Sequence, residues 1–182
     1  MIKMKDILDE KDKRLRNISK EVTFPLSQKD KDAINDMIEY LYDSQIEELS
    51  EKYNLRPGMG MAAIQLGINK RYFVVVHEVT EEDDEEQKFD TYVIINPVMV
   101  SHSEEEIADD AGEGCLSVNR DVEGYVKRYA RVKFEGYDID GNKISIRARE
   151  ELAIAFQHEL DHLNGILFID KITNNIDGIR TI

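Results

Sequence analysis

The segment Gln157-His158-Glu159-Leu160-Asp161-His162, late in the chain, contains the pattern His-Glu-x-x-His. Residues four apart on a helix lie on the same face, one turn from each other. The imidazoles of His158 and His162 can therefore bind one metal ion, with the Glu159 carboxylate beside it. Such a site suits a metal-activated water that attacks a carbonyl while a glutamate moves its proton. The pattern also occurs by chance on charged helices, so its interpretation depends on the rest of the chain.

A catalytic metal usually has a third protein ligand. One class of zinc peptidase would place a downstream histidine at position 168, where this chain has Phe168, although Gly165 fits that pattern. After His162 the remaining acidic residues are Asp170 and Asp177, which belong to no recognisable motif. The sequence therefore predicts a third ligand upstream of the helix.

The upstream candidates are the single cysteine and the two remaining histidines. Cys115 follows Gly114 and precedes Leu116-Ser117, so its backbone can approach another group closely. A thiolate with two imidazoles would make a tightly held site with one position free for water, although a lone cysteine is also commonly a small buried apolar residue. His77 lies in an apolar run that favours a strand, and His102 lies between serines in a segment that we expect to be exposed.

The chain contains three motifs in this order: Gly-x-Gly-x-Ala-Ala-x-Gln at residues 58–65, Glu-Gly-Cys-Leu-Ser at 113–117 and Gln-His-Glu-x-Asp-His at 157–162. In sequence and in order they resemble the motifs of the peptide deformylases. Members of that family remove the formyl group from the initiator methionine of new bacterial proteins. The resemblance covers about residues 4–170. The segment 44–55 and the long stretch between the first two motifs are similar to the longer, Gram-positive-type branch of the family.

The resemblance implies a metal site and a proton-transfer group. Cys115, His158 and His162 would hold one divalent ion, with Fe²⁺ expected physiologically. The same ligands also suit Zn²⁺, Ni²⁺ or Co²⁺ in a purified sample. Glu159 would accept the proton of the attacking water and deliver it to the departing amine.

The resemblance also implies how substrate binds. The side-chain amide of Gln65 and the backbone N–H of Leu116 would stabilise the oxygen of the tetrahedral intermediate. The substrate backbone would lie extended along the glycine-rich motif, and the methionine side chain would enter an apolar pocket. The residues expected to contact substrate are Gly58, Met59, Gly60, Ile154 and Ala155.

The chain departs from the family pattern at three positions. Met61 stands where leucine is usual, and Ile64 where proline or threonine is common. Both replacements are apolar, so the pocket should persist with a changed shape. Glu151 stands where an apolar residue near the methionine pocket is usual, which bears on side-chain specificity rather than on the metal chemistry.

Two other functions fit part of the pattern. A zinc peptidase is suggested by His-Glu-x-x-His alone, but the downstream ligand is missing. A non-catalytic deformylase-like protein that binds N-terminal methionine is suggested by Ile64 and Glu151. Release of formate from a formyl-methionyl peptide, measured beside cleavage of an unformylated peptide, separates these functions from a deformylase.

Composition limits the class of protein. The 182 residues, 41% hydrophobic, fit one catalytic domain over residues 1–182. No apolar run is long enough for a membrane span, and the N-terminus lacks the apolar segment of a signal peptide. One cysteine permits no internal disulfide, so we expect a cytoplasmic protein. A net charge of -14 argues against autonomous nucleic-acid binding.

The expected partners are N-formyl-methionyl nascent peptides, with transient proximity to the ribosome. The tail after Asp170 has two basic residues, adjacent asparagines and a glycine. It is therefore a poor helix former without a basic face.

The pattern of apolar residues predicts an α+β fold, with antiparallel strands around a central buried helix that carries the metal motif. Helices are expected over residues 29–53, capped by Ser27, and 149–164, ended by Gly165. Strands are expected over 72–79, 92–100, 132–139 and 143–148. The acidic run 81–86 should form an exposed hairpin tip, and Asp140-Gly141-Asn142 should form a second turn.

Overall fold

The computed structural model describes residues 2–182, and Met1, the first residue of the expected domain, lies outside the described residues. In chain order the helices and strands are α1 (Gln28–Gln45), α2 (Glu47–Tyr53), β1 (Gly60–Ala62), β2 (Tyr72–Glu78), β3 (Phe89–His102), β4 (Glu106–Ala108), β5 (Arg128–Tyr129), β6 (Arg131–Tyr137), β7 (Lys143–Arg149), α3 (Glu150–Leu163) and β8 (Arg180–Thr181). Short 3₁₀ turns occur at Met4–Asp6, Lys13–Arg16, Ala63–Leu66 and Phe168–Asp170.

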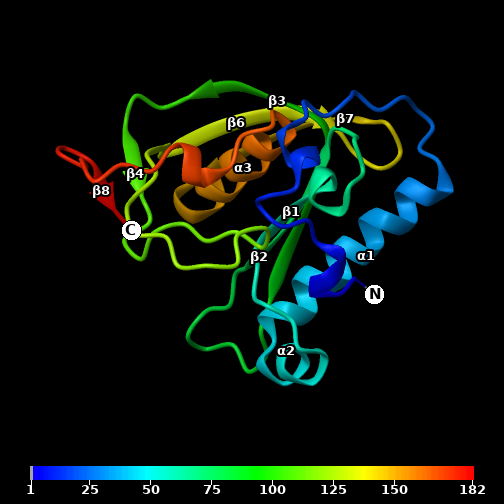
Figure 1. The fold of residues 1–182 in the computed structure, drawn as a ribbon, viewed down its shortest axis with the longest axis horizontal. Coiled ribbons are helices and arrows are strands. Elements are labelled where there is room, and N and C mark those ends of the chain that lie inside the picture. The colour runs from blue at the N-terminus through cyan, green and yellow to red at the C-terminus, as the bar shows by residue number, and fades with distance from the viewer. Residues whose placement is uncertain (1) are drawn as a thin grey trace.

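An antiparallel sheet with the strand order β1-β2-β3-β6-β7 forms the body of the molecule. Helices α1 and α3 lie on opposite faces of β2 (Figure 1). Val74 and Val76 of β2 pack into the core that contains α1, whereas Phe73 and Val75 pack into the core that contains α3. Because both faces of β2 are covered, its first five residues, 72–76, are all buried and do not alternate with exposed ones.

Phe156 fixes α3 against the sheet. Its ring centroid lies 5.6 Å from that of Phe73, 5.4 Å from that of Phe134 and 5.4 Å from that of Tyr92. The contacts with Phe134 and Tyr92 are edge-on and the contact with Phe73 is tilted. Aromatic pairs of this kind add about 0.5–1.5 kcal/mol each beyond area burial. The packing sets the rotation of α3, and therefore the direction in which its metal motif points.

The predicted α+β fold and both hairpins are confirmed. Strands β2 and β3 pair antiparallel around the acidic tip, and β6 and β7 pair around the second turn. Helix α3 is confirmed, and Gly165 follows it with a φ of +73°. A Cβ at Gly165 would lie 2.5 Å from the carbonyl oxygen of Arg16, so glycine is required there for space as well as for φ. Strand β3 extends beyond the predicted 92–100 and continues past Pro97 through shifts of register.

The single helix predicted over residues 29–53 is wrong. Ser27 caps α1 by accepting the N–H of Asp30, as expected, but the helix ends at Gln45 and α2 begins after Ile46. Side-chain groups of Ser44 and Gln45 donate to the carbonyl of Leu41, at 3.0 and 3.1 Å. These local bonds compete with the backbone ladder and end the helix.

A second, smaller sheet with the order β5-β4-β8 was not anticipated. Strands β4 and β8 pair in parallel, so the end of the chain returns to the body of the molecule (Figure 1). The tail is not helical, as the sequence predicts. None of the helices within residues 2–182 combines the length and the apolar character that a membrane span needs.

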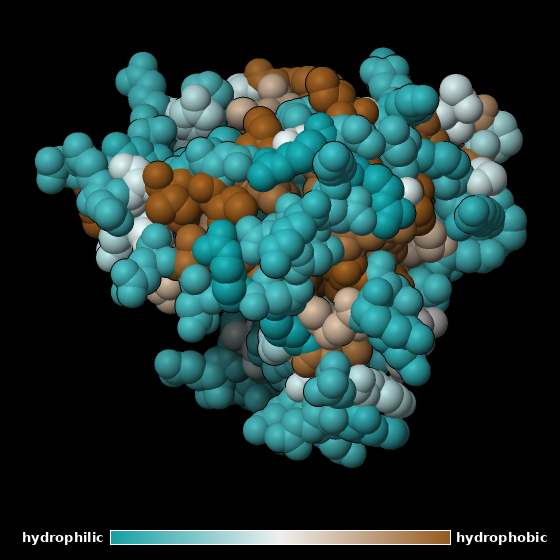
Figure 2. All heavy atoms as spheres, viewed as in Figure 1, coloured by the Kyte–Doolittle hydropathy of each residue, from teal (hydrophilic) through white to brown (hydrophobic). Residues whose placement is uncertain are grey.

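The face shown in Figure 2 is covered mainly by hydrophilic side chains, with hydrophobic side chains exposed in smaller areas between them. The high content of charged residues, 34% of the chain, accounts for this cover. Isolated apolar side chains on such a surface are normal for a folded protein.

Candidate active site

Helix α3 brings the two histidines of its motif together. His158 and His162 lie on the same face of α3, with ring centroids 4.9 Å apart and exposed fractions of 9% and 0%. Cys115, from the loop after β4, places its Sγ 3.2 Å from Nε2 of His162. One ligand atom from each of the three side chains lies within 4.8 Å of the others.

The other candidate ligands lie elsewhere. His77 is a strand residue in β2, as expected, with Nε2 3.5 Å from a carboxylate oxygen of Glu151. His102 is exposed at the end of β3, where it stacks on Tyr129. Asp170 pairs with Arg16, and Asp177 is exposed in the tail.

The three clustered side chains fit a divalent metal ion. Burial alone would raise the pKa of Cys115, but the neighbouring imidazoles of His162 and His158 lower the pKa well below its ordinary value. A thiolate and two imidazoles, converging in a buried place, are the soft donors that such ions prefer. Nδ1 of His162 and one oxygen of Glu159 are also buried without a hydrogen-bond partner in the described residues.

Glu113, the first residue of the second motif, orients His158. Its carboxylate accepts from Nδ1 of His158 at 2.8 Å and from Arg128 at 2.7 and 2.9 Å. Burial would raise the pKa of Glu113, but the hydrogen bonds from Arg128 and His158 outweigh it and lower the pKa to about 2. Fixing Nδ1 leaves Nε2 of His158 as the free ligand atom.

The ion network continues away from the cavity. Arg128 donates to Asp161 at 2.5 Å, and Lys171 donates to the same carboxylate at 2.7 Å. The side chain of Arg128 is 2% exposed and that of Asp161 is 11% exposed. Sequence reasoning missed Arg128 and Lys171, because an isolated basic residue carries no sign of its distant partner. Asp161 carried a signal, since it belongs to the third motif.

Glu159 is buried beside the cluster at 3% exposure. Burial raises the pKa of this carboxyl to about 7, against the opposing effect of the two imidazoles. A Cβ at Gly60 would lie 2.4 Å from an oxygen of Glu159, so only glycine allows β1 to approach the carboxyl this closely. A carboxyl with a near-neutral pKa can accept and return a proton at physiological pH.

Gln65 and Leu116 lie beside Cys115. The side-chain oxygen of Gln65 accepts the N–H of Ala62 at 2.9 Å, which fixes the amide. Its NH₂ group lies 3.1 Å from Oγ of Ser117 and 3.7 Å from Sγ of Cys115. This arrangement directs the amide hydrogens of Gln65 toward Ser117 and Cys115.

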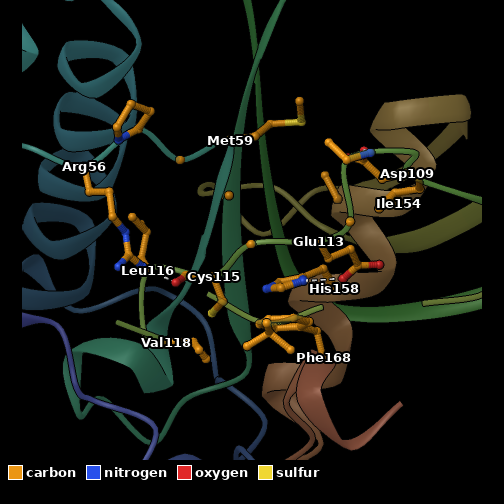
Figure 3. A pocket seen from close by; sticks show the side chains of 18 of the residues that line it. Arg56, Met59, Asp109, Glu113, Cys115, Leu116, Val118, Ile154, His158 and Phe168 are labelled. Atoms are coloured by element: carbon orange, nitrogen blue, oxygen red, sulfur yellow. Dashed lines mark hydrogen bonds and ion pairs between the residues drawn. The ribbon is translucent and has the colours of Figure 1, made fainter. Parts of the chain in front are cut away.

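A cavity of about 800 Å³ gives access to these groups (Figure 3). Cys115, His158 and Glu159 line it, whereas His162 is fully buried. The other site residues predicted from the sequence also line it: Gly58, Met59, Gly60, Gln65, Leu116, Ile154 and Ala155. Arg56, which was not predicted, also lines it and donates to the carbonyl of Cys115.

The chain was compared with known proteins. The family model described as polypeptide deformylase matches residues 4–176. A peptide deformylase of Shouchella clausii is 47% identical over 180 residues, which cover 99% of this chain and 96% of the relative. Peptide deformylase 2 of Bacillus anthracis is 45% identical over 94% of this chain and 91% of that protein. These relatives are of the Gram-positive, Bacillus type that the sequence predicts.

Solved structures give the same result. The crystal structure of a probable peptide deformylase from Synechococcus phage S-SSM7 matches with a TM-score of 0.71 and 35% identity, covering 91% of this chain and 98% of that chain. Together with the sequence relatives, this match covers nearly all of the chain, including the cavity and all three motifs. The chain therefore belongs to the polypeptide deformylase family.

Proposed function

We propose that this protein hydrolyses the N-formyl group from the initiator formyl-methionine of nascent polypeptides and releases formate. The observation that carries the proposal is the cluster of Cys115, His158 and His162 beside Glu159, which an open cavity reaches through Cys115, His158 and Glu159. Membership of the deformylase family supports it. A deformylase of Acinetobacter baumannii, 27% identical with a TM-score of 0.69 over 91% of this chain and 96% of that chain, is described as bound to Met-Ala-Ser. That peptide begins with methionine, as a deformylated product would.

Cys115, His158 and His162 are the metal ligands in this proposal. A divalent ion bound there would polarise the formyl carbonyl and lower the pKa of water toward neutrality. Fe²⁺ is the physiological ion that we expect, and Zn²⁺, Ni²⁺ or Co²⁺ suit the same donors. Glu113 would hold the His158 ring in the orientation that binds the ion.

Glu159 is the proton-transfer group. Its near-neutral pKa lets the carboxylate take a proton from the attacking water and return it to the departing amine nitrogen. The amide of Gln65 and the backbone N–H of Leu116 would donate to the oxygen that becomes negative as the formyl carbon turns tetrahedral.

The cavity wall would bind the peptide. The substrate backbone would lie extended beside β1, along Gly58 and Gly60, which line the cavity. The methionine side chain would lie between Met59, Ile154 and Ala155, which line the cavity with apolar surface.

We further propose that residues 1–182 act as one catalytic domain in the cytoplasm. Its partners would be formyl-methionyl nascent chains, met in transient proximity to the ribosome. Direct binding to nucleic acid is not part of the proposal, because the net charge of the chain is -14.

The test is formate release from formyl-Met-Ala-Ser by the Fe²⁺-loaded or Ni²⁺-loaded protein, with unformylated Met-Ala-Ser-Ala as a parallel substrate. We expect formate from the first and no peptide-bond cleavage of the second. Cleavage of the unformylated peptide without formate release would instead identify a zinc peptidase. Tight binding of both peptides without any turnover would identify a non-catalytic methionine binder.

A separate measurement tests the ligand set. If Cys115 is a ligand, its thiolate should be protected from alkylation in the metal-loaded protein and react after chelation. Equal labelling in both states, with metal loss verified by elemental analysis, would exclude Cys115 and point to a carboxylate ligand.

A further inference from the structure

Glu151 is an acidic side chain at the mouth of the cavity without a catalytic role in the proposed reaction. It lies in the first turn of α3 and lines the same cavity as His158. Its side chain is 65% exposed, and its carboxylate lies 3.5 Å from Nε2 of His77. The carboxylate is thus held at the rim and remains open to a ligand.

The position of Glu151 along α3 sets which part of a peptide it can reach. Glu151 precedes His158 by seven residues, which at 1.5 Å per residue is roughly 10 Å along the helix axis. Ile154 and Ala155, one turn after Glu151, lie on the same face of α3 between Glu151 and His158. An extended peptide advances about 3.3 Å per residue, so this distance corresponds to about three residues.

The alternation of side chains along an extended peptide then indicates that the third residue of the substrate lies near Glu151. This step rests on the proposed function, in which the formyl group lies at His158 and the methionine side chain enters the wall formed by Ile154 and Ala155. In an extended peptide, side chains one and three point to the same face and side chain two points away. The third side chain therefore returns to α3 at the level of Glu151.

The charges around the cavity favour a cation at that level. Asp109 also lines the cavity, and Figure 3 shows it beside Ile154. The basic side chains of the lining are already engaged. Arg56 lies on the opposite side, bound to the carbonyl of Cys115 and to Asn119, and Arg120 pairs with Glu10 at 2.8 Å.

We propose that Glu151 is a specificity-determining residue that favours lysine or arginine as the third residue of the formyl peptide. The carboxylate attracts the cation during binding and does not take part in bond breaking. The preference should therefore appear mainly in KM, with kcat little changed, and should weaken as ionic strength rises.

The test compares kcat/KM of the metal-loaded enzyme for formyl-Met-Ala-Lys-Ala, formyl-Met-Ala-Gln-Ala and formyl-Met-Ala-Glu-Ala at low salt. An exposed ion pair corresponds to a preference of about two- to five-fold for Lys over Gln, with Glu the poorest. Glu151→Gln should remove this order, Glu151→Asp should keep part of it, and Glu151→Lys should reverse it. Glu135→Gln, on the far strand β6 and outside this cavity, is the matched control and should keep the order.

Any of the following results would overturn the inference. The first is a Lys preference that survives Glu151→Gln. The second is loss of the Lys preference in the variant Asp109→Asn, in which Glu151 is intact. The third is a charge preference at the second residue, in formyl-Met-Lys-Ala-Ala, with none at the third. Equal formate release from all peptides would defeat this inference alone, whereas no formate from any of them would defeat the proposed function.

Discussion

The two ends of the cavity are built on different physical principles. At the inner end, the side chains of Glu113 and Arg128 are 4% and 2% exposed and pair with each other. At the outer end, the side chain of Glu151 is 65% exposed, so its carboxylate is accessible to solvent. Removing one member of a buried pair leaves an uncompensated charge in a low dielectric, whereas an exposed charge is solvated with or without its partner.

In the proposals above, the buried inner end serves catalysis and the exposed outer end serves substrate selectivity. The inner end holds His158 through several interlocking bonds, so substitutions there disturb the site as a whole. The outer end should tolerate substitution, because Glu151 is exposed and is not among the clustered ligand atoms. The following changes test this division, beginning with the largest effect.

The largest loss of activity is expected when the carboxyl of Glu159, at the inner end, is replaced. Glu159→Gln keeps the size of the side chain but removes its proton-accepting ability. We expect kcat to fall by roughly two to four orders of magnitude, with the metal retained, because Glu159 is not among the clustered ligand atoms. Formate release and metal content of the same preparation are the measurements. Near-normal turnover would remove Glu159 from the mechanism.

Arg128 tests whether the inner end depends on its buried ion pairs. Arg128→Met leaves Glu113 without its strongest partner and should cost about 3–5 kcal/mol in the free energy of unfolding. Urea unfolding measures that loss, and faster release of metal to a chelator reports the loosened His158.

The control for this change is another arginine with a carboxylate partner. Arg131 pairs with Glu105 at 2.7 Å but is 59% exposed. Arg131→Met should cost less than about 1 kcal/mol. Equal losses for the two variants would show that burial does not set the contribution of these ion pairs to stability.

The same division decides what could be predicted from the sequence. The closeness of His158 and His162 and the course of α3 could be predicted because a helix places residues four apart on one face. The Ser27 cap and the β6–β7 turn were accessible because their signals are local. The break at Ile46 was not, since Ser44 and Gln45 are compatible with a helix until their side chains bond to Leu41.

Long-range partners explain the remaining differences. Arg128 meets Asp161 across 33 residues, and β8 pairs with β4 across more than 70. No local pattern marks either partner, and a two-residue strand such as β8 has no periodicity to detect. The clustering of the site side chains could therefore be predicted from the sequence, whereas the ion pairs around Arg128 and the pairing of β8 with β4 could not.

A buried carboxylate remote from the cavity gives a smaller, pH-dependent effect. Burial alone would raise the pKa of Asp30, but hydrogen bonds from Lys70 and Ser27 outweigh it and lower the pKa. A lowered pKa in the folded state stabilises the protein above the unfolded pKa of about 3.9, and this contribution is lost as pH falls through the folded value.

Asp30→Asn should therefore reduce the free energy of unfolding at pH 7, by roughly 1 kcal/mol given the partial exposure of Lys70. The deficit relative to the unmodified protein should shrink below about pH 4. Urea unfolding from pH 3 to 7 measures it. A deficit that stays constant over this range would show that the charge of Asp30 is not what stabilises the start of α1.

The smallest effect, on ribosome binding, is expected for substitutions in the exposed C-terminal tail. Both basic side chains of residues 171–182 are already paired with carboxylates. Lys171 binds Asp161, and Arg180 binds Glu105 and Glu150 at 3.1 and 2.8 Å. The tail therefore presents no free basic face to ribosomal RNA.

We expect Arg180→Gln to leave ribosome co-sedimentation at low salt unchanged. This variant is a sharper probe than deletion after Asp170, because deletion also removes Lys171 and its bond to Asp161, which lies one residue before His162. Unchanged sedimentation is expected because neutralising a side chain that already binds two carboxylates removes no cation available to phosphate. Tight binding that is sensitive to salt and lost in Arg180→Gln would show instead that Arg180 exchanges its carboxylate partners for RNA, and that exposed ion pairs of this protein act as a docking device.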